Sequence, residues 1–269
     1  MSRIKTRFAQ LKQQNKKALI PFFTAGDPSP ALTVPMMHAL AEAGADIIEL
    51  GVPFSDPMAD GPTIQRASER ALRHHVGLKD ILGMVCEFRK QNTETPVVLM
   101  GYANPIEAMG YEKFARDAQA AGVDGVLTVD YPPEECGEFL ACLAQHNLDP
   151  IFLLSPTSVD ARVAAVAKAA RGFVYYVSLK GVTGAANLDL AEVKARLTKL
   201  RKQISLPLGV GFGIRDGAMA KAMAEFSDAV VIGSRIVQEI ESAPADQVTT
   251  RVGALVKSIR TAMDSEKEF

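Results

Sequence analysis

Eight short β-rich segments alternate with helical segments along this chain, and this alternation limits the folds open to it more than any other feature. The predicted strands are Ala18–Thr24, Asp46–Gly51, Pro96–Met100, Gly125–Val129, Pro150–Leu154, Phe173–Ser178, Leu206–Gly211 and Ala229–Gly233. Helical periodicity is found between them, in Leu32–Ala43, Tyr111–Ala121, Glu134–Gln145, Ala161–Ala170, Leu190–Lys202 and Ala218–Glu225. Strands that are joined through helices pair in parallel, so the pattern predicts an α/β protein with a parallel sheet.

The strand–helix unit repeats within the sequence. Glu42–Ile48 and Ala120–Val126 each read as a helix that ends at a glycine and turns into a strand, and Phe226–Val231 repeats the pattern without the glycine. A series of eight such units is typical of a closed (β/α)8 barrel, the TIM barrel, rather than of two domains. Because no linker rich in Pro, Gly or Ser interrupts the series, we expect residues 1–269 to form a single barrel domain.

The N-terminal segment has a helical pattern of its own. Ile4, Phe8 and Leu11 are spaced to lie on one face of a helix, among six lysines and arginines. The segment lacks the apolar stretch of a secretory signal. We therefore expect an extra amphipathic helix that packs on the barrel, rather than a targeting sequence.

Composition narrows the possible partners of the chain. Lys and Arg number 30 against 31 Asp and Glu, so the basic excess of a nucleic-acid binder is lacking. No apolar run approaches the ~18 residues that a membrane span needs. Three cysteines without a CxxC pattern indicate a reducing compartment, and we expect a cytoplasmic protein. None of the four histidines has metal-ligand spacing, so we expect no metal.

Glu49 is the first candidate for catalysis, because it interrupts an apolar strand. Alternation along this strand puts Ile48 and Leu50 on one face and Glu49 on the other. If the two aliphatic side chains face the helices, Glu49 points into the barrel mouth, where poor solvation raises the pKa of a carboxyl group. A buried salt bridge would also explain the residue, but no lysine or arginine lies nearby in the sequence. The pattern favours a general acid or base.

Two connections are longer than a simple strand–helix link needs. About fifty residues separate the second and third strands, and the excess includes the loop Gly51–Gly61. The other long connection, Leu179–Asn187, follows the sixth strand, so in a barrel both loops lie on the catalytic face. Asp56 and Asp60 occupy the first loop, where either could be only a turn or cap residue. Their position beside Glu49 favours a second catalytic carboxylate.

Glycine-rich turns follow the last two predicted strands, at Gly209–Ile214 and Val231–Arg235. Barrels commonly bind phosphate at these two turns, through backbone N–H groups and the N-terminus of a helix. Ser234 adds a hydroxyl group, although it could serve only as a helix cap. The turns predict a small phosphorylated substrate.

One continuous run makes the sequence recognisable. Residues 48–61 read Ile-Glu-Leu-Gly-Val-Pro-Phe-Ser-Asp-Pro-Met-Ala-Asp-Gly, which resembles the signature of the tryptophan synthase alpha subunit family. This signature contains both carboxylates and the loop between them. Further family-like segments are Pro21–Pro28, Tyr102–Pro105, Gly181–Gly184, Gly211–Ile214 and Gly233–Ser234, so the resemblance spans almost the whole chain.

The resemblance implies a (β/α)8 lyase that cleaves indole-3-glycerol phosphate to indole and glyceraldehyde 3-phosphate, without a metal or organic cofactor in this chain. It also implies a partner, a beta subunit that carries pyridoxal phosphate, in an α2β2 complex. The catalytic residues that it implies are Glu49, Asp60 and Tyr175. The implied phosphate contacts are Gly184, Gly213, Gly233 and Ser234. The positions that line the indole pocket or support its loops are Phe22, Met100, Thr183 and Phe212.

Two features depart from the family pattern, and three different functions stay open. Arg235 stands where the family often has a small apolar residue, and Leu179–Lys180 fill a variable part of the sixth loop.

The first alternative function is a Schiff-base aldolase. Lys180 could serve such an enzyme, although little in its glycine-flanked loop would lower the pKa of its amine. A stand-alone indole-releasing lyase of the same fold would need no beta subunit. A non-catalytic phosphate-binding subunit would be expected to lack Glu49 or Asp60, and both are present.

Overall fold

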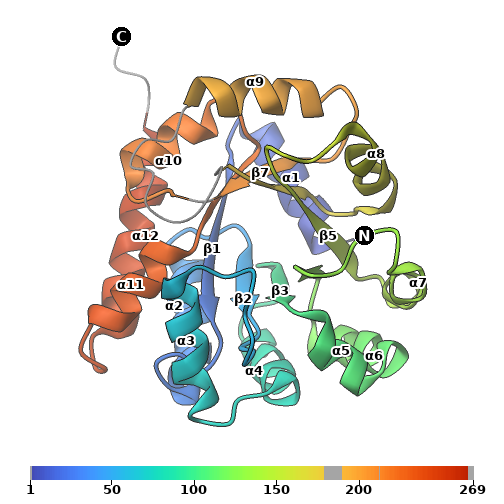
Figure 1. Cartoon of the computed structure of the whole chain (residues 1–269). Helices are drawn as coiled ribbons and strands as arrows, with labels where there is room; N and C mark the ends of the chain where they lie inside the picture. Colours follow the sequence, from blue (N-terminus) through green and yellow to red (C-terminus); the bar gives the residue numbers. More distant parts are fainter. Residues whose placement is uncertain (1, 179–189, 212, 266–269) are drawn as a thin grey trace.

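Eight parallel strands form a closed barrel, and each strand pairs with its neighbours in the sequence. The structure is a computed structural model that describes residues 2–178, 190–211 and 213–265 (Figure 1). The strands are β1 (Ala18–Thr24), β2 (Ile48–Gly51), β3 (Val97–Gly101), β4 (Gly125–Thr128), β5 (Asp149–Leu154), β6 (Val174–Val177), β7 (Leu208–Gly211) and β8 (Ala229–Ile232). The predicted (β/α)8 barrel is confirmed.

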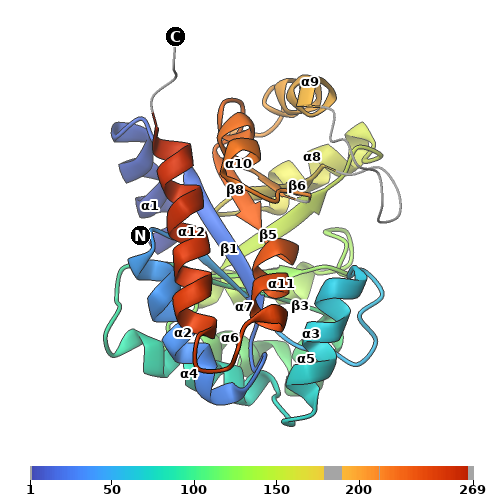
Figure 2. The same ribbon diagram turned by 90° about the vertical axis from the view of Figure 1, so that its left-hand side faces the viewer.

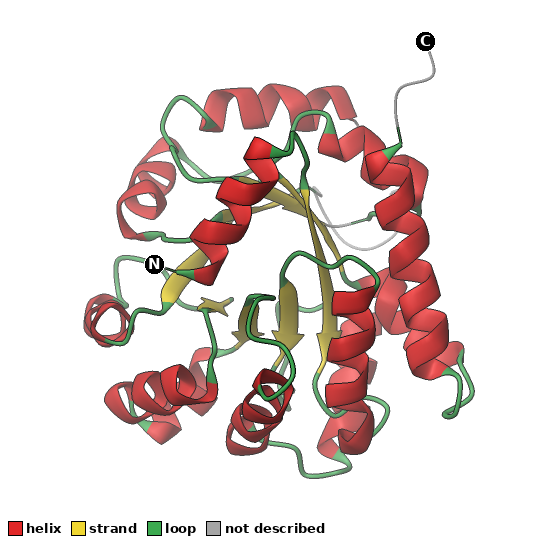
Figure 3. Ribbon diagram, turned by 180° about the vertical axis from the view of Figure 1, so that it is seen from behind, coloured by secondary structure: helices red, strands yellow, loops and turns green. Residues whose placement is uncertain are grey.

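Most of the helices surround the strands as an outer ring, and one lies across the end of the barrel (Figure 1 and Figure 3). The helices are α1 (Arg3–Gln13), α2 (Pro30–Glu42), α3 (Pro62–Leu72), α4 (Leu78–Arg89), α5 (Ala103–Met109), α6 (Tyr111–Ala121), α7 (Gly137–Gln145), α8 (Asp160–Ala169), α9 (Leu190–Leu200), α10 (Gly217–Ala224), α11 (Ser234–Ser242) and α12 (Val248–Asp264). The long connection between β2 and β3 holds two helices, α3 and α4. The second of these accounts for much of the length that the sequence pattern leaves unexplained.

Alternation along each strand divides the core into two layers. Outward-facing side chains, such as Ile48 and Leu50, pack against the helices. Inward-facing side chains, such as Ile47 and Val98, fill the barrel near its N-terminal end. Glu49 lies between Ile48 and Leu50 and therefore faces the interior, as the alternation predicts.

Helix α1 covers the N-terminal end of the barrel, where Figure 3 shows it crossing the strands. Ile4 and Leu11 are buried, and the ring of Phe8 lies 6.0 Å from the ring of Phe173 inside the barrel. The expected N-terminal helix is confirmed. Because α1 blocks this end, the interior opens to solvent at the opposite end, where the strands terminate.

Ionic contacts fasten the N-terminal end around two buried carboxylates. Asp124 accepts hydrogen bonds from Arg89 and Arg3, at 2.8 Å each, and from the backbone N–H of Val97. Asp46 accepts the N–H of Leu19 at 2.8 Å and pairs with Arg260 of α12. These contacts tie the starts of strands to α1, α4 and α12.

The last helix closes the ring. β1 pairs with β8, from Ala18 opposite Ala229 to Pro21 opposite Ile232. Helix α12 packs against both α2 and α10 (Figure 2). Within the described residues, none of the helices has the length and apolar character needed to cross a membrane.

Candidate active site

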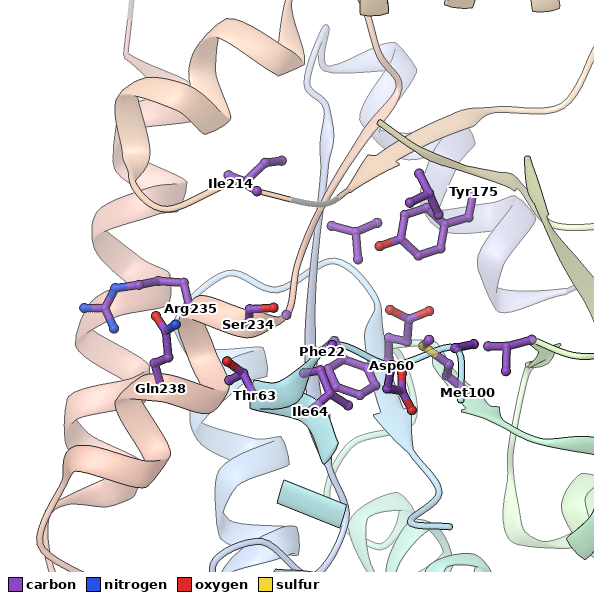
Figure 4. Close-up of a pocket in the computed structure, with 18 of the residues that line it drawn as sticks. Phe22, Asp60, Thr63, Ile64, Met100, Tyr175, Ile214, Ser234, Arg235 and Gln238 are labelled. Atoms are coloured by element: carbon purple, nitrogen blue, oxygen red, sulfur yellow. The ribbon is translucent and has the colours of Figure 1, made fainter. Parts of the chain in front are cut away.

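A cavity of ≈ 540 Å³ opens at the C-terminal ends of the strands (Figure 4). Its walls are largely apolar and include Phe22, Met100, Val129, Leu153 and Val231. The carboxyl groups of Glu49 and Asp60 lie in one part of the cavity, and the backbone at Gly213 and Gly233 borders another. An apolar pocket with a few converging polar groups is the usual form of a small-molecule site.

Glu49 is enclosed by the strands on both sides of β2. It is 1 % exposed, and its neighbours in register are Phe22 of β1 and Val98 of β3. Its Oε1 atom has no hydrogen-bond partner among the described residues. Burial raises the pKa of Glu49 to about 8, and the nearby carboxylate of Asp60 adds to the increase. The carboxyl group can therefore give or accept a proton near neutral pH.

Asp60 lies at the end of the loop between β2 and α3. The hydroxyl of Tyr102 donates to its Oδ2 at 3.0 Å and accepts the backbone N–H of Ala59, also at 3.0 Å. Tyr102 is itself stacked on Phe54 of the same loop, with 5.0 Å between ring centroids. Burial raises the pKa of Asp60, and the hydrogen bond from Tyr102 lowers it. Tyr102 thus fixes the position of the loop and the orientation of the Asp60 carboxylate.

Tyr175 stands on β6, and its hydroxyl lies over the backbone of β7. A Cβ atom at Gly211 would lie 2.2 Å from that hydroxyl oxygen, so only glycine leaves room for the ring. Burial, and then the charge of Glu49, raises the pKa of Tyr175, which keeps the phenol protonated. Figure 4 shows its hydroxyl directed into the cavity.

The glycine-rich part of the cavity offers backbone donors to an anion. Gly213 has a φ of +79°, a conformation that glycine adopts without strain. Gly233 precedes α11, which begins at Ser234 and has no acidic residue in its first turn. By contrast, the N-terminus of α10 is already capped by Asp216, which accepts the N–H of Met219 at 2.9 Å. An anion is therefore better accommodated at α11.

The structure brings most of the predicted site residues into one cavity. Its lining includes Phe22, Glu49, Asp60, Met100, Tyr175, Gly213, Gly233 and Ser234. Four other residues singled out from the sequence, Lys180, Thr183, Gly184 and Phe212, lie outside the described residues. Among the described residues there is no group of three or more His, Cys, Asp or Glu side chains that could hold a metal ion.

Several further residues touch the site. Tyr102 belongs to a family-like segment of the sequence, but nothing in the pattern ties it to Asp60. Gln238 lines the cavity one turn after Ser234, and their i, i+4 spacing on α11 is a signal that could have identified it. The guanidinium of Arg235 is directed away from the cavity in Figure 4 and pairs with Glu239 at 2.9 Å.

Two more carboxylates in loops after the strands have local partners. Asp56 is exposed and accepts the hydroxyl of Ser55, and Asp130 accepts the backbone N–H of Ala103 at 2.9 Å. Neither lines the cavity.

The fold and the cavity together define a class of protein. A closed parallel barrel with unlike carboxyl groups at the C-terminal ends of its strands is a (β/α)8 barrel enzyme equipped for acid–base chemistry. Residues 8–264 match the family described as tryptophan synthase alpha chain. The chain belongs to the tryptophan synthase alpha chain family.

Individual relatives agree with this assignment over their full length. The tryptophan synthase alpha chain of Nitrosomonas europaea is 64% identical over 268 residues, which cover 100% of this chain and 98% of that protein. The corresponding protein of Thiobacillus denitrificans is 65% identical over 265 residues, which cover 98% of this chain and 97% of that protein.

Solved structures give the same result. The crystal structure of tryptophan synthase subunit alpha from Legionella pneumophila has a TM-score of 0.92 and 47% identity, over 98% of this chain and 99% of that one. A chain of tryptophan synthase from M. tuberculosis, in its aminoacrylate-bound form, has a TM-score of 0.88 and 36% identity, over 98% and 100% of the two chains. The chain is thus an alpha subunit of tryptophan biosynthesis and a lyase.

Proposed function

We propose that the cavity at the barrel mouth cleaves indole-3-glycerol phosphate to indole and glyceraldehyde 3-phosphate, with Glu49 and Asp60 in different roles. The observation that carries this proposal is the difference between their surroundings. Glu49 is fully enclosed with a pKa of about 8, whereas Asp60 receives a hydrogen bond from Tyr102. Two carboxyl groups in unlike environments can act as proton carrier and as fixed charge.

Glu49 carries the proton in this proposal. Its carboxyl group donates a proton to C3 of the indole ring, which makes the ring an electron sink. The resulting carboxylate then takes the proton of the glycerol hydroxyl group next to the breaking bond. The C–C bond breaks as the hydroxyl becomes an aldehyde, and its electron pair returns to the indole ring. Glu49 ends the cycle protonated, so no other proton donor is consumed.

Asp60 acts through its charge. As a carboxylate it accepts the indole N–H and stabilises the positive charge that the protonated ring develops. Tyr175 contributes a protonated hydroxyl near Glu49, on the opposite side of the barrel interior from β2. The apolar walls, with Phe22 and Met100, exclude water from the ring and strengthen both electrostatic effects.

The phosphate group binds near the N-terminus of α11, whose first turn holds no acidic residue. We place it between Gly213 and the start of α11, at Gly233 and Ser234, with Gly184 as a further contact expected from the sequence. The open space at Gly213, where a Cβ would meet nothing within 4 Å, supports this placement. Thr183 and Phe212 complete the set of expected indole-pocket residues.

A beta subunit is the expected partner of the chain. The structures of M. tuberculosis tryptophan synthase contain a chain of this fold, which supports such a partner. We propose an α2β2 complex in which the beta subunit carries pyridoxal phosphate, while this chain uses no cofactor. Residues 1–269 would act as one barrel domain within it, in the cytoplasm.

An indole-release assay tests the proposal directly. Purified chain is incubated with indole-3-glycerol phosphate, with and without a beta subunit, and indole and glyceraldehyde 3-phosphate are measured separately. We expect equal amounts of the two products, and no reaction when the substrate lacks its phosphate. Borohydride treatment during turnover should leave the chain unmodified, because the proposed reaction forms no covalent bond between an amine and the substrate. Trapping of substrate on an amine would instead support a Schiff-base aldolase.

A further inference from the structure

The last residue of β1, Thr24, has a buried hydroxyl group without a protein partner. Thr24 is 1 % exposed, and its Oγ1 atom makes no hydrogen bond within the described residues. Strand alternation places it on the same inward face as Phe22, beside Gly51 of β2 in register. A buried hydroxyl group without any hydrogen bond is costly, and a buried polar group that lacks a protein partner can bond to ordered water instead.

A small cavity lies beside this hydroxyl group, and Asp60 also lines it. Its polar lining residues are Thr24, Asp60, Ser68 and Tyr102, and the remainder of its wall is apolar side chains and backbone. The cavity has space for the centre of about one water molecule. Ser68, on the second turn of α3, is 4 % exposed, so residues of both β1 and α3 line the cavity.

We propose that this cavity is a binding site for one structural water molecule, which connects Thr24 and Ser68 to the carboxylate of Asp60. Thr24 donates its hydroxyl proton to the water oxygen. The water in turn donates one proton to the carboxylate and the other to the hydroxyl oxygen of Ser68. Three polar partners are what a buried water molecule usually has.

This water supplies a hydrogen bond that the protein leaves unmade. A carboxylate has about four acceptor positions. Among the described residues, the side chain that donates to Asp60 is that of Tyr102, and its bond goes to Oδ2. A donor on the side of β1 and α3 would hold the second oxygen and stop the carboxylate from rotating. Thr24 and Ser68 are therefore positioning residues, which act on the reaction through Asp60.

The charged groups around Asp60 explain why a neutral donor matters there. Glu49 faces it from β2 and carries the same charge when ionised. The two arginines of α3 are engaged elsewhere, since Arg66 pairs with Glu241 and Arg70 pairs with both Asp27 and Glu241. The groups that face the site from the end of β3 and from β6 are the phenols of Tyr102, which directly follows β3, and Tyr175. Because no described cation pairs with Asp60, hydrogen bonds are the contacts that lower its pKa against the effect of burial.

The decisive test removes one hydroxyl group and restores it. Thr24→Val keeps the shape of the side chain, and Thr24→Ser keeps the hydroxyl. Thr128→Val is the matched control, because Thr128 also has a buried hydroxyl without a partner but lines neither cavity. The pKa of Asp60 is read in each protein by ¹³C NMR of the labelled carboxyl group, with Asp60→Asn for assignment. A crystal structure of the wild type, at a resolution that shows ordered water, completes the set.

We expect the wild type to show one water molecule within hydrogen-bond distance of Thr24, Ser68 and Asp60. In Thr24→Val the pKa of Asp60 should rise by about one unit, which corresponds to the loss of roughly one hydrogen bond to a charged group. Thr24→Ser should return it to within a few tenths of the wild-type value, and Thr128→Val should not change it. Ser68→Ala should raise it in the same direction as Thr24→Val, which provides a second variant if Thr24→Val folds poorly.

The inference rests on the proposed role of Asp60, but its failure can be recognised separately. A dry cavity in the wild type, or an unchanged pKa of Asp60 in both Thr24→Val and Ser68→Ala, would overturn the water site even if indole-3-glycerol phosphate is cleaved. Conversely, a wild type that releases no indole refutes the proposed reaction, while the NMR and crystallographic readouts still decide the water site. In an active enzyme, the acid limb of kcat/KM should move with the pKa of Asp60 in Thr24→Val and return in Thr24→Ser.

Discussion

Two buried carboxylates at the N-terminal end of the barrel and the two carboxyl groups that line the cavity at the other end have opposite surroundings. At the N-terminal end, Asp46 and Asp124 each receive a backbone N–H and at least one arginine. At the C-terminal end, Glu49 and Asp60 have no ion-pair partner among the described residues. Their polar contacts are neutral, such as the hydroxyl of Tyr102.

This difference separates the stabilising charges from the reactive ones. A carboxylate that is paired with arginine and backbone N–H groups stabilises the strand ends, and its oxygen atoms are already engaged in these contacts. A carboxyl group that is buried without compensation destabilises the fold, and it gains a shifted pKa that suits proton transfer. Stability and activity should therefore respond to different substitutions at the two ends.

The largest expected effect is at the reactive end. Glu49→Gln keeps the size of the side chain but removes the proposed proton carrier, so turnover should fall by about 10²–10⁴-fold. Indole release under saturating substrate measures this, and binding of a substrate analogue checks that the site is intact. Turnover within tenfold of the wild type would remove Glu49 from the mechanism.

The same variant should change how stability depends on pH. The pKa of Glu49 is raised from 4.5 to about 8, so the folded protein binds the proton more tightly than the unfolded chain does. The wild type therefore loses stability between about pH 4.5 and pH 8, by up to about 5 kcal/mol. Urea unfolding of both proteins across this range should show a difference that increases with pH in favour of Glu49→Gln, and a constant difference would contradict the shift.

At the stabilising end, Asp124→Ala should have a large effect on folding and little effect on chemistry. Arg89 would remain buried without its carboxylate partner, which typically costs about 3–5 kcal/mol in the free energy of unfolding. Glu87→Ala is the control, because Glu87 pairs with Lys90 at the exposed surface, where an ion pair contributes less than about 1 kcal/mol. Equal losses of stability in the two variants would refute the comparison.

Gly213→Val tests the proposed phosphate end of the cavity. The positive φ of Gly213 and the side chain placed beside it should weaken binding, so KM should rise by about tenfold or more while kcat changes less. Inhibition by glycerol phosphate, which lacks the indole ring, should weaken in parallel. A normal inhibition constant would place the phosphate elsewhere.

The smallest expected effect concerns the support of Asp60. Tyr102→Phe removes the hydroxyl that donates to Asp60 and accepts from Ala59, and turnover should fall by about tenfold, the equivalent of one hydrogen bond to a charged group. Tyr131→Phe removes a hydroxyl that contacts Tyr111 and Glu107 outside the cavity. It should leave turnover unchanged, and similar losses in both variants would point to a general effect on the loops.

The sequence could predict the features that depend on local periodicity. The strand–helix alternation defines the barrel, and the period of two along β2 is sufficient to direct Glu49 inward. The spacing of Ile4, Phe8 and Leu11 likewise predicts α1 and the face that it buries. The glycine-rich turns after β7 and β8 could be placed together because the C-terminal ends of parallel strands meet at one end of a barrel.

The contacts between loops could not be predicted in the same way. Helix α4 is not among the predicted helices, because the length of a connection does not say how its residues fold. The hydrogen bond from Tyr102 to Asp60 joins residues 42 positions apart, and it depends on how the loop after β2 folds over the end of β3. Thr24 and Ser68 line the same small cavity only because α3 packs against β1. Such pairs follow from tertiary packing, which one sequence does not encode as a pattern.

The pairing of β1 with β8 has a consequence for how the chain can be made. During synthesis β1 gains β2 as a neighbour early, but its other edge stays unpaired until residues 229–232 have left the ribosome. Every shorter chain is therefore an open sheet with two exposed edges, which is the form most exposed to pairing with other chains. Closure brings together residues more than two hundred positions apart, and such long-range contacts slow folding. One edge of β1 therefore stays without its native partner for most of the synthesis of the chain.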